Sequence, residues 1–382
     1  MNGKKLVNAR FLHTEGGELY FDDAPIYTYD GIVVEKDSAV CDFQEYNMRG
    51  MIVMPALFNL HSHLGESMYR DISGSDWTIE RYLQYTNKIN EDMDLMERRR
   101  CWESSARFTI DEMKKYGTVG FCAARSAEIS KEMGILTMSG YPIMNNIKLI
   151  DYKTAGREGF EKYDKMNRSD SCSIGVFLHS VYANDQESLR LAAMCMEAGA
   201  EFISTHVSED YSTRILECEM HGMTAVEVLD ENGLLSEKSI LVHCGYASES
   251  DLNLIKDRGA VICICPISNA FLNTRMIDIN ALNKLGIPWI IGTDGLATGR
   301  TFSLRRQVNM AKENNTDVAY KDFWMSITTR PGKLFRRKIY TGSIDIGSKT
   351  DFIVFDSMEN DVERVMADFF TANGTNIQFI TI

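Results

Sequence analysis

The middle of the chain alternates short apolar runs with longer stretches in which apolar residues recur at helical spacing. Eight of these runs are candidate strands, and they cover residues 51–60, 118–123, 135–139, 173–178, 202–205, 239–242, 261–265 and 288–292. A short strand followed by an amphipathic helix is typical of a parallel βα unit. Because eight such units close a (β/α)8 barrel, the pattern predicts this α/β fold.

The two ends of the chain have a different pattern, in which short apolar runs are broken by turn residues. Near the N-terminus such runs include Ile32 and Val33, and near the C-terminus residues 352–355 and 377–382 are candidate strands. We predict that residues 1–54 and 338–382 together form one small β-sandwich domain. Residues 55–337 would then form the barrel domain.

The charge and composition narrow the class of partner. The 382 residues include 54 acidic and 41 basic ones, with a formal net charge of -13. This excess of negative charge disfavours nucleic acid and anionic membranes as partners and favours a small neutral or cationic ligand. No stretch approaches the ~20 apolar residues that a membrane span needs. We therefore expect a cytoplasmic protein, whose nine cysteines lack paired spacing and are expected to be reduced.

Most of the histidines lie at or just beyond the C-terminal ends of candidate strands. With one aspartate after the last strand, this group comprises His61, His63, His179, His206, His243 and Asp294. All strand ends of a parallel barrel open onto one face, so these residues converge there. The strand period of two sends His61 and His63 to the same side. With His206 and Asp294 they offer three nitrogen donors and one carboxylate, which suits one zinc or iron(II) ion and leaves room for a water.

Two further residues near this predicted metal site are candidates for moving protons, which hydrolysis at neutral pH requires. Glu209 follows His206 by three residues, where its carboxyl could reach both the water and a ring nitrogen. The alternative for Glu209 is a solvated acid stabilised by the helix dipole. His243 could orient the water or shuttle its proton, or it could instead bind the metal. His179 would contact the substrate or be structural.

Four segments carry these residues in a fixed order along the chain. Residues 55–63 read PALFNLHSH, residues 206–209 HVSE, residues 265–269 CPISN and residues 292–295 GTDG, with His243 between the second and third. In this order they resemble the amidohydrolase superfamily. They are most similar to its mononuclear branch, which contains the cytosine, guanine, methylthioadenosine and adenosylhomocysteine deaminases and the triazine hydrolases. The likeness covers nearly the whole chain.

This resemblance implies a role for each candidate residue. The implied metal ligands are His61, His63, His206 and Asp294. Glu209 would be the proton shuttle, His243 would orient or deprotonate the water, and His179 would lie in the substrate pocket. Binuclear members carry a carboxylated lysine after the fourth strand, where this chain has His179 instead, so the resemblance implies one metal ion. Family members commonly form homodimers or larger homo-oligomers.

The leading hypothesis is an aminohydrolase that deaminates a small N-heterocycle, such as a pyrimidine, purine, pterin or nucleoside-like ring, through a metal-activated water. In this hypothesis Glu209 and Asp294 move protons and ammonia leaves. The alternative is a hydrolase of the same superfamily that opens a cyclic amide or removes chloride from a triazine. A third hypothesis is a metal-binding protein without catalysis. Glu209 and His243 argue against it, because a structural metal needs neither a proton shuttle nor an open position.

Substrate contacts are harder to predict, because the loops after barrel strands set specificity and vary freely. The nucleoside deaminases of the branch usually carry a Glu and a Trp on the loop after the first strand, and the closest stretch of this chain contains Glu80 and Tyr82. The predicted substrate contacts are His179, Glu80, Tyr82, Trp77 and Arg125.

Overall fold

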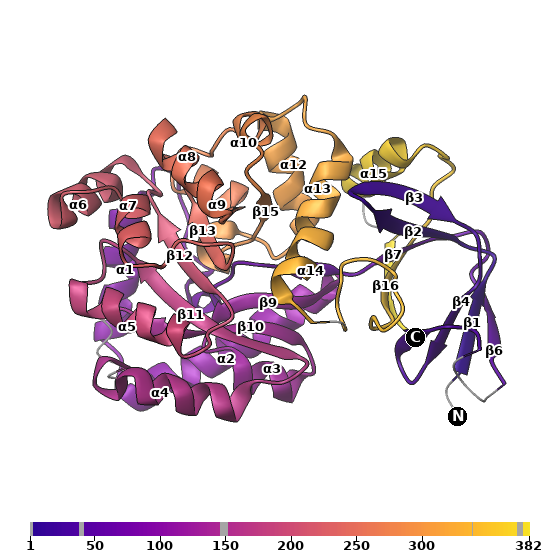
Figure 1. Cartoon of the computed structure of the whole chain (residues 1–382), viewed down its shortest axis with the longest axis horizontal. Helices are drawn as coiled ribbons and strands as arrows, with labels where there is room; N and C mark the ends of the chain where they lie inside the picture. Colours follow the sequence, from indigo (N-terminus) through magenta and orange to yellow (C-terminus); the bar gives the residue numbers. More distant parts are fainter. Residues whose placement is uncertain (1–2, 38–41, 146–151, 338, 373–376) are drawn as a thin grey trace.

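The computed structural model describes residues 3–37, 42–145, 152–337, 339–372 and 377–382. It has a large α/β part and a smaller, mainly β part beside it (Figure 1). The first strands of the chain and its last strand both lie in the smaller part. The chain therefore leaves the smaller part, builds the α/β part and returns.

The α/β part contains one sheet of eight parallel strands in sequence order, which confirms the predicted barrel fold. These strands are β8 (Leu57–Asn59), β9 (Thr118–Ala124), β10 (Leu136–Ile143), β11 (Cys172–Ser180), β12 (Ile203–Val207), β13 (Ser239–His243), β14 (Val261–Ile264) and β15 (Trp289–Ile291). Apart from the first, each strand begins and ends within four residues of its predicted bounds. Apolar side chains at alternate strand positions, such as Met138, Val242 and Cys263, pack into one buried cluster.

The sheet closes into a barrel just beyond the ends of its two edge strands, β8 and β15. The backbone N–H groups of Thr293 and Asp294 both donate to the carbonyl oxygen of His61, at 3.2 and 3.1 Å. The side-chain amide of Asn59 donates to the hydroxyl of Thr293 at 2.7 Å. These bonds hold the segments after β8 and β15 side by side.

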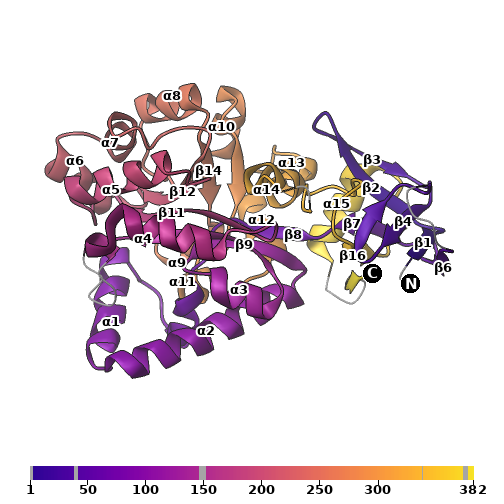
Figure 2. The same ribbon diagram turned by 60° about the horizontal axis from the view of Figure 1, so that its bottom comes forward.

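Helices cover the outside of the sheet (Figure 2). They are η1 (Leu64–Tyr69), α1 (Ile79–Glu91), α2 (Leu95–Lys115), α3 (Ala127–Met133), α4 (Tyr152–Asn167), α5 (Gln186–Glu197), α6 (Tyr211–His221), α7 (Ala225–Glu231), α8 (Glu249–Arg258), α9 (Pro266–Phe271), α10 (Ile279–Leu285), α11 (Leu296–Gly299), α12 (Leu304–Asn314), α13 (Tyr320–Ile327) and α14 (Thr329–Phe335). Local sequence sets their ends. Helix α8, for example, begins at a capping box between Ser248 and Asp251 and stops at Gly259, whose φ is 70°.

The smaller part consists of two sheets, and both ends of the chain contribute strands to it. One sheet contains, in spatial order, β5 (Ile32–Val34), β4 (Ile26–Tyr29), β1 (Gly3–Val7) and β6 (Gln44–Asn47). The other contains β17 (Ile377–Thr381), β16 (Asp351–Phe355), β7 (Ile52–Pro55), β2 (Arg10–Glu15) and β3 (Glu18–Asp22). Residues of both sheets, including Leu6, Val53 and Phe352, share one buried cluster. The predicted split β module is therefore present.

The prediction of one strand over residues 51–60 is wrong, because these residues form two strands that belong to different sheets. Strand β7 pairs with β16 in the smaller part, whereas β8 pairs with β9 in the barrel. The break falls at Ala56, whose N–H donates to the carbonyl oxygen of Asp351, while the N–H of Leu57 donates to that of Gly117. The exact domain bounds at residues 54 and 338 stay a prediction, and residue 338 lies outside the described residues.

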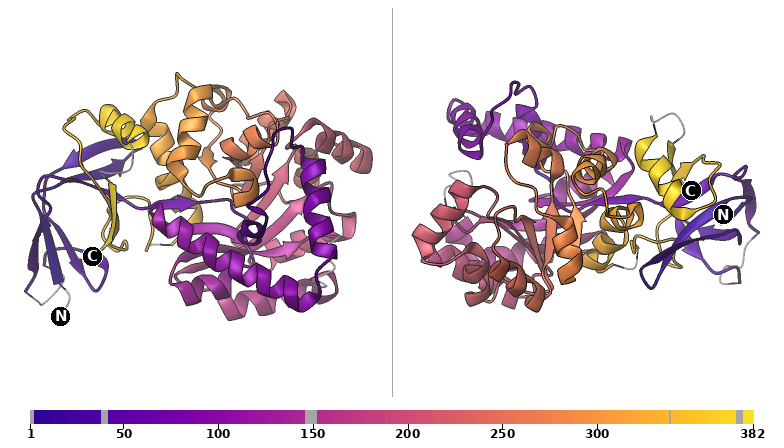
Figure 3. Two further views of the ribbon diagram at one scale, coloured as in Figure 1. Left: turned by 180° about the vertical axis from the view of Figure 1, so that it is seen from behind. Right: turned by 90° about the horizontal axis from the view of Figure 1, so that it is seen from above.

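One helix near the C-terminus was not predicted. Helix α15 (Val362–Thr371) follows β16 and packs against α12 and α13 of the barrel (Figure 3). Its buried residues Val365, Met366 and Phe369 recur at helical spacing and belong to the main core cluster. The helix therefore joins the smaller part to the outside of the barrel.

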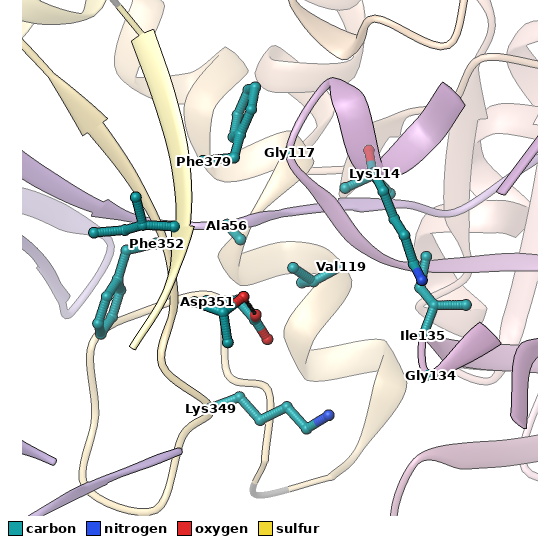
Figure 4. A pocket seen from close by; sticks show the side chains of 13 residues that line it. Ala56, Lys114, Gly117, Val119, Gly134, Ile135, Lys349, Asp351, Phe352 and Phe379 are labelled. Carbon is teal, nitrogen blue, oxygen red and sulfur yellow. Dashed lines mark hydrogen bonds between the residues drawn. The ribbon is translucent and has the colours of Figure 1, made fainter. Parts of the chain in front are cut away.

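A cavity of about 330 Å³ lies where the first residues of β9 face strands β16 and β17. Figure 4 shows Val119, Asp351 and Phe379 around it. It is at the N-terminal end of the barrel strands, opposite the face that carries the candidate residues. Within the described residues, no helix is long and apolar enough to span a membrane. Eight cysteines are unpaired, and Cys41 lies outside the described residues.

Candidate metal centre and active site

The four predicted metal ligands come together at the C-terminal mouth of the barrel. His61 and His63 follow β8, His206 lies in β12 and Asp294 follows β15. One nitrogen or oxygen atom from each residue lies within 4.8 Å of all the others. Because β8 and β15 are the two edges of the sheet, the hydrogen bonds that close the barrel also bring Asp294 beside the histidines.

The spacing of these atoms fits one metal ion. The Nε2 atom of His206 lies 3.2 Å from the Nε2 atoms of both His61 and His63. The Oδ1 atom of Asp294 lies 3.4 Å from Nε2 of His61 and 3.1 Å from Nε2 of His63. Ligand atoms that are about 2.0–2.1 Å from a tetrahedral zinc ion lie about 3.3 Å from each other. The four groups present therefore suit an ion of this size, in both donor type and separation.

Neighbouring groups orient two of these side chains. The Nδ1 atom of His206 lies 2.6 Å from the carbonyl oxygen of His179, to which its N–H donates. This hydrogen bond leaves the lone pair on Nε2, the atom that faces the cluster. The Oδ2 atom of Asp294 accepts hydrogen bonds from the hydroxyls of Ser268 at 2.5 Å and Thr298 at 3.0 Å. Its other oxygen is thereby directed at the histidines.

The electrostatic setting suits metal ligands. Burial lowers the pKa of His61 and lowers that of His206 well below its usual range. Burial also lowers the pKa of His63, but the charge of Glu66 and the hydrogen bond with Asp294 outweigh this and raise it to about 9. Burial alone would raise the pKa of Asp294, yet its hydrogen bonds with His61 and His63 hold it well below its usual range. The ionised Asp294 and the neutral imidazoles of His61 and His206 are in the form that binds a cation, whereas His63 would have to release its proton when a cation binds.

Glu209 and His243 lie beside the cluster, on the segments that end β12 and β13. The Oε1 atom of Glu209 is 3.4 Å from Nε2 of His243, and both residues are buried. Burial, with the charge of Asp294, raises the pKa of Glu209 well above its usual range. Burial lowers the pKa of His243 to about 4. A neutral carboxyl group next to a neutral imidazole can pass protons in either direction.

His243 is not one of the four clustered ligand groups. The side-chain N–H of Asn269 donates to Nδ1 of His243 at 3.4 Å and also to the hydroxyl of Thr274 at 2.8 Å. With Nδ1 accepting, the ring proton is on Nε2, which cannot then bind a metal. This geometry favours the orientation of a water over metal binding, of the two predicted roles for His243.

Left-handed backbone angles mark the strand ends that carry these residues. The φ angles are 41° at Ser208, 70° at His243 and 62° at Asp294. Side chains other than glycine adopt this region at a cost, and such strain is concentrated at functional sites. The surrounding hydrogen bonds must therefore hold these segments in place.

Glu217 holds one of these strained segments, and it was not predicted from the sequence. It lies on α6 with its side chain fully buried. Its Oε1 atom accepts from the backbone N–H of Ser208 at 3.2 Å, and its Oε2 atom accepts from the Ser208 hydroxyl at 2.9 Å. Ser208 lies between His206 and Glu209, so Glu217 fixes the turn that positions both. The one sequence signal is that Glu217 shares a helix face with Thr213, the N3 residue of the α6 capping box.

Three of the predicted substrate contacts lie at this mouth or on helix α1, near Glu66. His179 ends β11 half-buried, with its ring centre 4.9 Å from that of His206. Arg125 follows β9 with a φ of 55°, and its guanidinium lies 5.4 Å from the ring centre of Trp102. Tyr82 is buried on α1. Burial, and after it the charge of Glu66, raises the pKa of its hydroxyl well above the usual range. Their roles in binding stay predictions.

Two other predicted substrate contacts are placed differently. Helix α1 buries Ile79, Tyr82 and Thr86, so Glu80 falls on its exposed face, where it accepts a hydrogen bond from Gln84 at 3.1 Å. Trp77 packs into a small apolar cluster, and its indole N–H donates to the carbonyl oxygen of Ser73 at 3.2 Å. The structure therefore brings neither side chain to the ligand group.

Glu66 is a second residue that the sequence analysis missed. It lies in η1, three residues after His63, and its Oε1 atom is 3.7 Å from Nδ1 of His63. Burial raises its pKa to about 7, and the charge of His63 opposes this shift. The signal that could have revealed it is an acidic residue one helical turn after the predicted ligand pair.

A family model described as "Amidohydrolase family" matches residues 52–379 of the chain. The chain belongs to the amidohydrolase family. The match begins at β7 and runs into β17, so it includes the whole barrel and the strands that return to the smaller part. The residues that the family model matches therefore include the whole barrel and the four clustered His and Asp residues of this amidohydrolase.

Several known proteins are similar to this amidohydrolase. The 5-methylthioadenosine/S-adenosylhomocysteine deaminase of Acetivibrio thermocellus is 27% identical over 301 residues, which are 74% of this chain and 67% of the relative. The guanine deaminase of C. acetobutylicum, solved with bound guanine, has a TM-score of 0.78 at 19% identity and covers 97% of this chain and 96% of its own. An adenosine deaminase of Xanthomonas campestris, solved with bound zinc, has a TM-score of 0.79 at 19% identity, with coverage of 96% and 90%.

Proposed function

We propose that this amidohydrolase is a metal-dependent aminohydrolase that removes an amino group from a small N-heterocycle. The observation that carries the proposal is the group of three imidazoles and one carboxylate within 4.8 Å, with Glu209 and His243 beside it. A structural metal site needs no such proton carriers. The similar proteins named above are called deaminases, and this agrees with the proposal.

The nucleophile in this proposal is a water molecule. His61, His63, His206 and Asp294 would hold the zinc ion, which would lower the pKa of that water so that it could attack at neutral pH. We propose zinc because nitrogen and carboxylate donors at this spacing suit it, with iron(II) as the alternative. The similar adenosine deaminase was solved with zinc.

The side chains around the metal ligands then handle the protons. Glu209, kept neutral by burial and by the charge of Asp294, gives its proton to a ring nitrogen and recovers one from the attacking water. His243 orients that water through its Nε2–H. Asp294, the nearby carboxylate, transfers the second proton of the water to the amino group. The ring carbon gains the water oxygen, its bond to the amine breaks, and the products are ammonia and a ring carbonyl.

The finer features of the proposal concern partners and location. We propose a small heterocyclic molecule as the partner of the site, and the negative net charge of the chain argues against a nucleic acid. A homodimer or larger homo-oligomer and a cytoplasmic location complete the proposal. Sedimentation of the purified protein tests the oligomer directly.

A screen for ammonia release tests the function. The panel contains aminated pyrimidines, purines, pterins and nucleosides, together with cyclic amides and chlorotriazines, and zinc and iron are measured on the same sample. We expect ammonia from at least one aminated ring, in proportion to bound metal, and none from protein stripped by a chelator. A metal-loaded sample that opens cyclic amides or releases chloride but yields no ammonia would instead support the second hydrolase activity.

A further inference from the structure

The four predicted metal ligands come from both edges of the barrel sheet. Strands β8 and β15 stand at opposite ends of the strand order, and within the part of the chain that the structure describes no ladder of backbone hydrogen bonds joins them. His61 and His63 follow β8, whereas Asp294 follows β15. An ion held by these ligands would therefore bridge the junction of residues 59–61 with residues 293–294, which we call the seam. Its affinity must depend on how firmly the seam is held.

The side chain of Asn59 crosses the seam and uses both ends of its amide group. Its Nδ2–H donates to the hydroxyl of Thr293 at 2.7 Å, and its Oδ1 accepts from the backbone N–H of Thr293 at 3.1 Å. The Thr293 hydroxyl donates in turn to the carbonyl oxygen of Asp294 at 3.1 Å. Asn59 and Thr293 are both fully buried. A satisfied buried polar network of this kind rigidifies the segments that it joins.

The network acts on the backbone that carries one of the ligands. Asp294 has a φ of 62°, in a region that side chains other than glycine adopt at a cost. Because Thr293 precedes it, Asp294 cannot relax toward an ordinary conformation without disturbing the buried hydrogen bonds of Asn59. Across the seam, Oδ1 of Asp294 lies 3.4 Å from Nε2 of His61. A small rotation of this segment would therefore separate two ligand atoms.

Other contacts of Asp294 do not fix this separation. The hydroxyls of Ser268 and Thr298 donate to its Oδ2 atom, but they come from α9 and α11 and not from the β8 side of the seam. Across the seam, the backbone N–H of Asp294 donates to the carbonyl oxygen of His61 at 3.1 Å. The side chain of Asn59, two residues before His61, adds the side-chain connection between the same two segments.

We infer, on the basis of the proposed function, that Asn59 and Thr293 are positioning residues for the metal. They hold His61 and Asp294 at the separation that one ion requires, and they thereby set the affinity of the site for zinc. Neither residue is one of the clustered ligand groups. The inference goes beyond the proposed function because it concerns the affinity of the site for its metal and not the reaction.

Two substitutions of Thr293 make a matched test. Valine is similar to threonine in shape but has no hydroxyl, so Thr293→Val leaves the Nδ2–H of Asn59 without its acceptor, whereas Thr293→Ser keeps the hydroxyl. The Kd for zinc is measured by competition with a chromophoric chelator. Loss of a group that supports metal ligands typically lowers affinity 10- to 100-fold, so we expect the Kd to rise by about that factor in Thr293→Val and to stay near the wild type in Thr293→Ser.

Asn59→Ala removes the other half of the pair and should raise the Kd for zinc by a similar factor. The double variant Asn59→Ala with Thr293→Val should lose no more affinity than the weaker-binding single variant, because both changes remove the same interaction. At saturating zinc, kcat should stay close to the wild type, because Glu209 and His243 come from the ends of β12 and β13, away from the seam. A fall in kcat without a change in the Kd for zinc would overturn the inference.

Asn315→Ala is the control for a general loss of stability. Asn315 is 3% exposed, its Oδ1 accepts from the N–H of Ile279 at 3.1 Å, and its Nδ2–H donates to the carbonyl oxygen of Ala311 at 2.9 Å. Like Asn59 it is a buried amide that joins two segments, but these are α10 and α12. We expect Asn315→Ala to lower the Tm as Asn59→Ala does and to leave the Kd for zinc unchanged.

The outcomes separate this inference from the proposed function. A wild-type Kd for zinc in both Thr293→Val and Asn59→Ala overturns the inference, as does an equal rise in Asn315→Ala. If zinc binds with the predicted order of affinities but no aminated ring releases ammonia, the proposed activity fails while the role of Asn59 and Thr293 stands. Wild-type protein that binds no zinc overturns both.

Discussion

Replacement of Glu217 by alanine tests how the loop that carries Glu209 is held. The substitution removes the acceptors of two hydrogen bonds from Ser208, at 3.2 and 2.9 Å, inside a fully buried site. An unsatisfied buried N–H costs about 1–3 kcal/mol, and the lost hydroxyl bond adds about 1 kcal/mol. We expect a loss of about 3 kcal/mol in the free energy of unfolding. Because domains are stable by about 5–15 kcal/mol, the variant should still fold.

The catalytic effect should exceed the effect on metal binding. Without Glu217, Ser208 can leave its left-handed conformation, and a displacement of Glu209 by about 1 Å is enough to cost roughly 100-fold in rate. His206 stays held by β12 and by the carbonyl of His179, so the metal should remain. Steady-state kcat per bound metal is the measurement. Glu217→Gln, which can still accept from the N–H, should be milder, and Glu219→Ala on the exposed face of α6 should match the wild type. A wild-type kcat per metal in Glu217→Ala would refute the reasoning.

The remaining predictions concern proton carriers, pH and metal. Glu209→Gln should keep the metal and lose at least ~100-fold in turnover, whereas Asp294→Ala should weaken both; unchanged turnover in Glu209→Gln would remove it from the mechanism. Burial raises the pKa of Glu217 from 4.5 to about 7, so its contribution to stability is full below pH 4.5 and is lost as the pH rises through 7. Glu217→Gln should therefore gain roughly 3 kcal/mol relative to the wild type over this interval, as measured by urea unfolding at several pH values, and a constant difference would contradict this. Chelation should lower the Tm and added zinc should restore it, since a ligand of the folded state stabilises that state; a Tm independent of zinc would argue against the site.

The barrel and its ligand group could be predicted because strong local patterns determine them. Short apolar runs spaced by amphipathic stretches predict βα units, and the parallel arrangement then brings the strand ends to one face. His61 and His63 fall two residues apart, His206 lies near the end of β12, and Asp294 follows β15. The parallel topology predicts that they meet at one face, and hydrogen bonds beyond the strand ends then bring their ligand atoms within 4.8 Å.

The errors and omissions arise where a contact between distant segments decides the outcome. Residues 51–60 are apolar apart from Asn59, so nothing in their pattern shows that β7 and β8 belong to different sheets. The hydrogen bonds of Glu217 to Ser208 depend on how α6 folds back over the end of β12. Glu66 and Glu80 are both acidic residues that follow His63 in the sequence. Glu80 points away from the site because it is not on the buried face of α1. Glu66 reaches the site because Gly295 leaves space for its carboxylate.

The most direct test of the central claim is a crystal structure of the metal-loaded protein with anomalous scattering recorded on both sides of the zinc edge. The account predicts one zinc peak per chain, bonded to the Nε2 atoms of His61, His63 and His206 and to Oδ1 of Asp294, with Glu209 and His243 close to the remaining position. A structure in which these four side chains hold no metal, or in which His243 replaces one of them as a ligand, would contradict it.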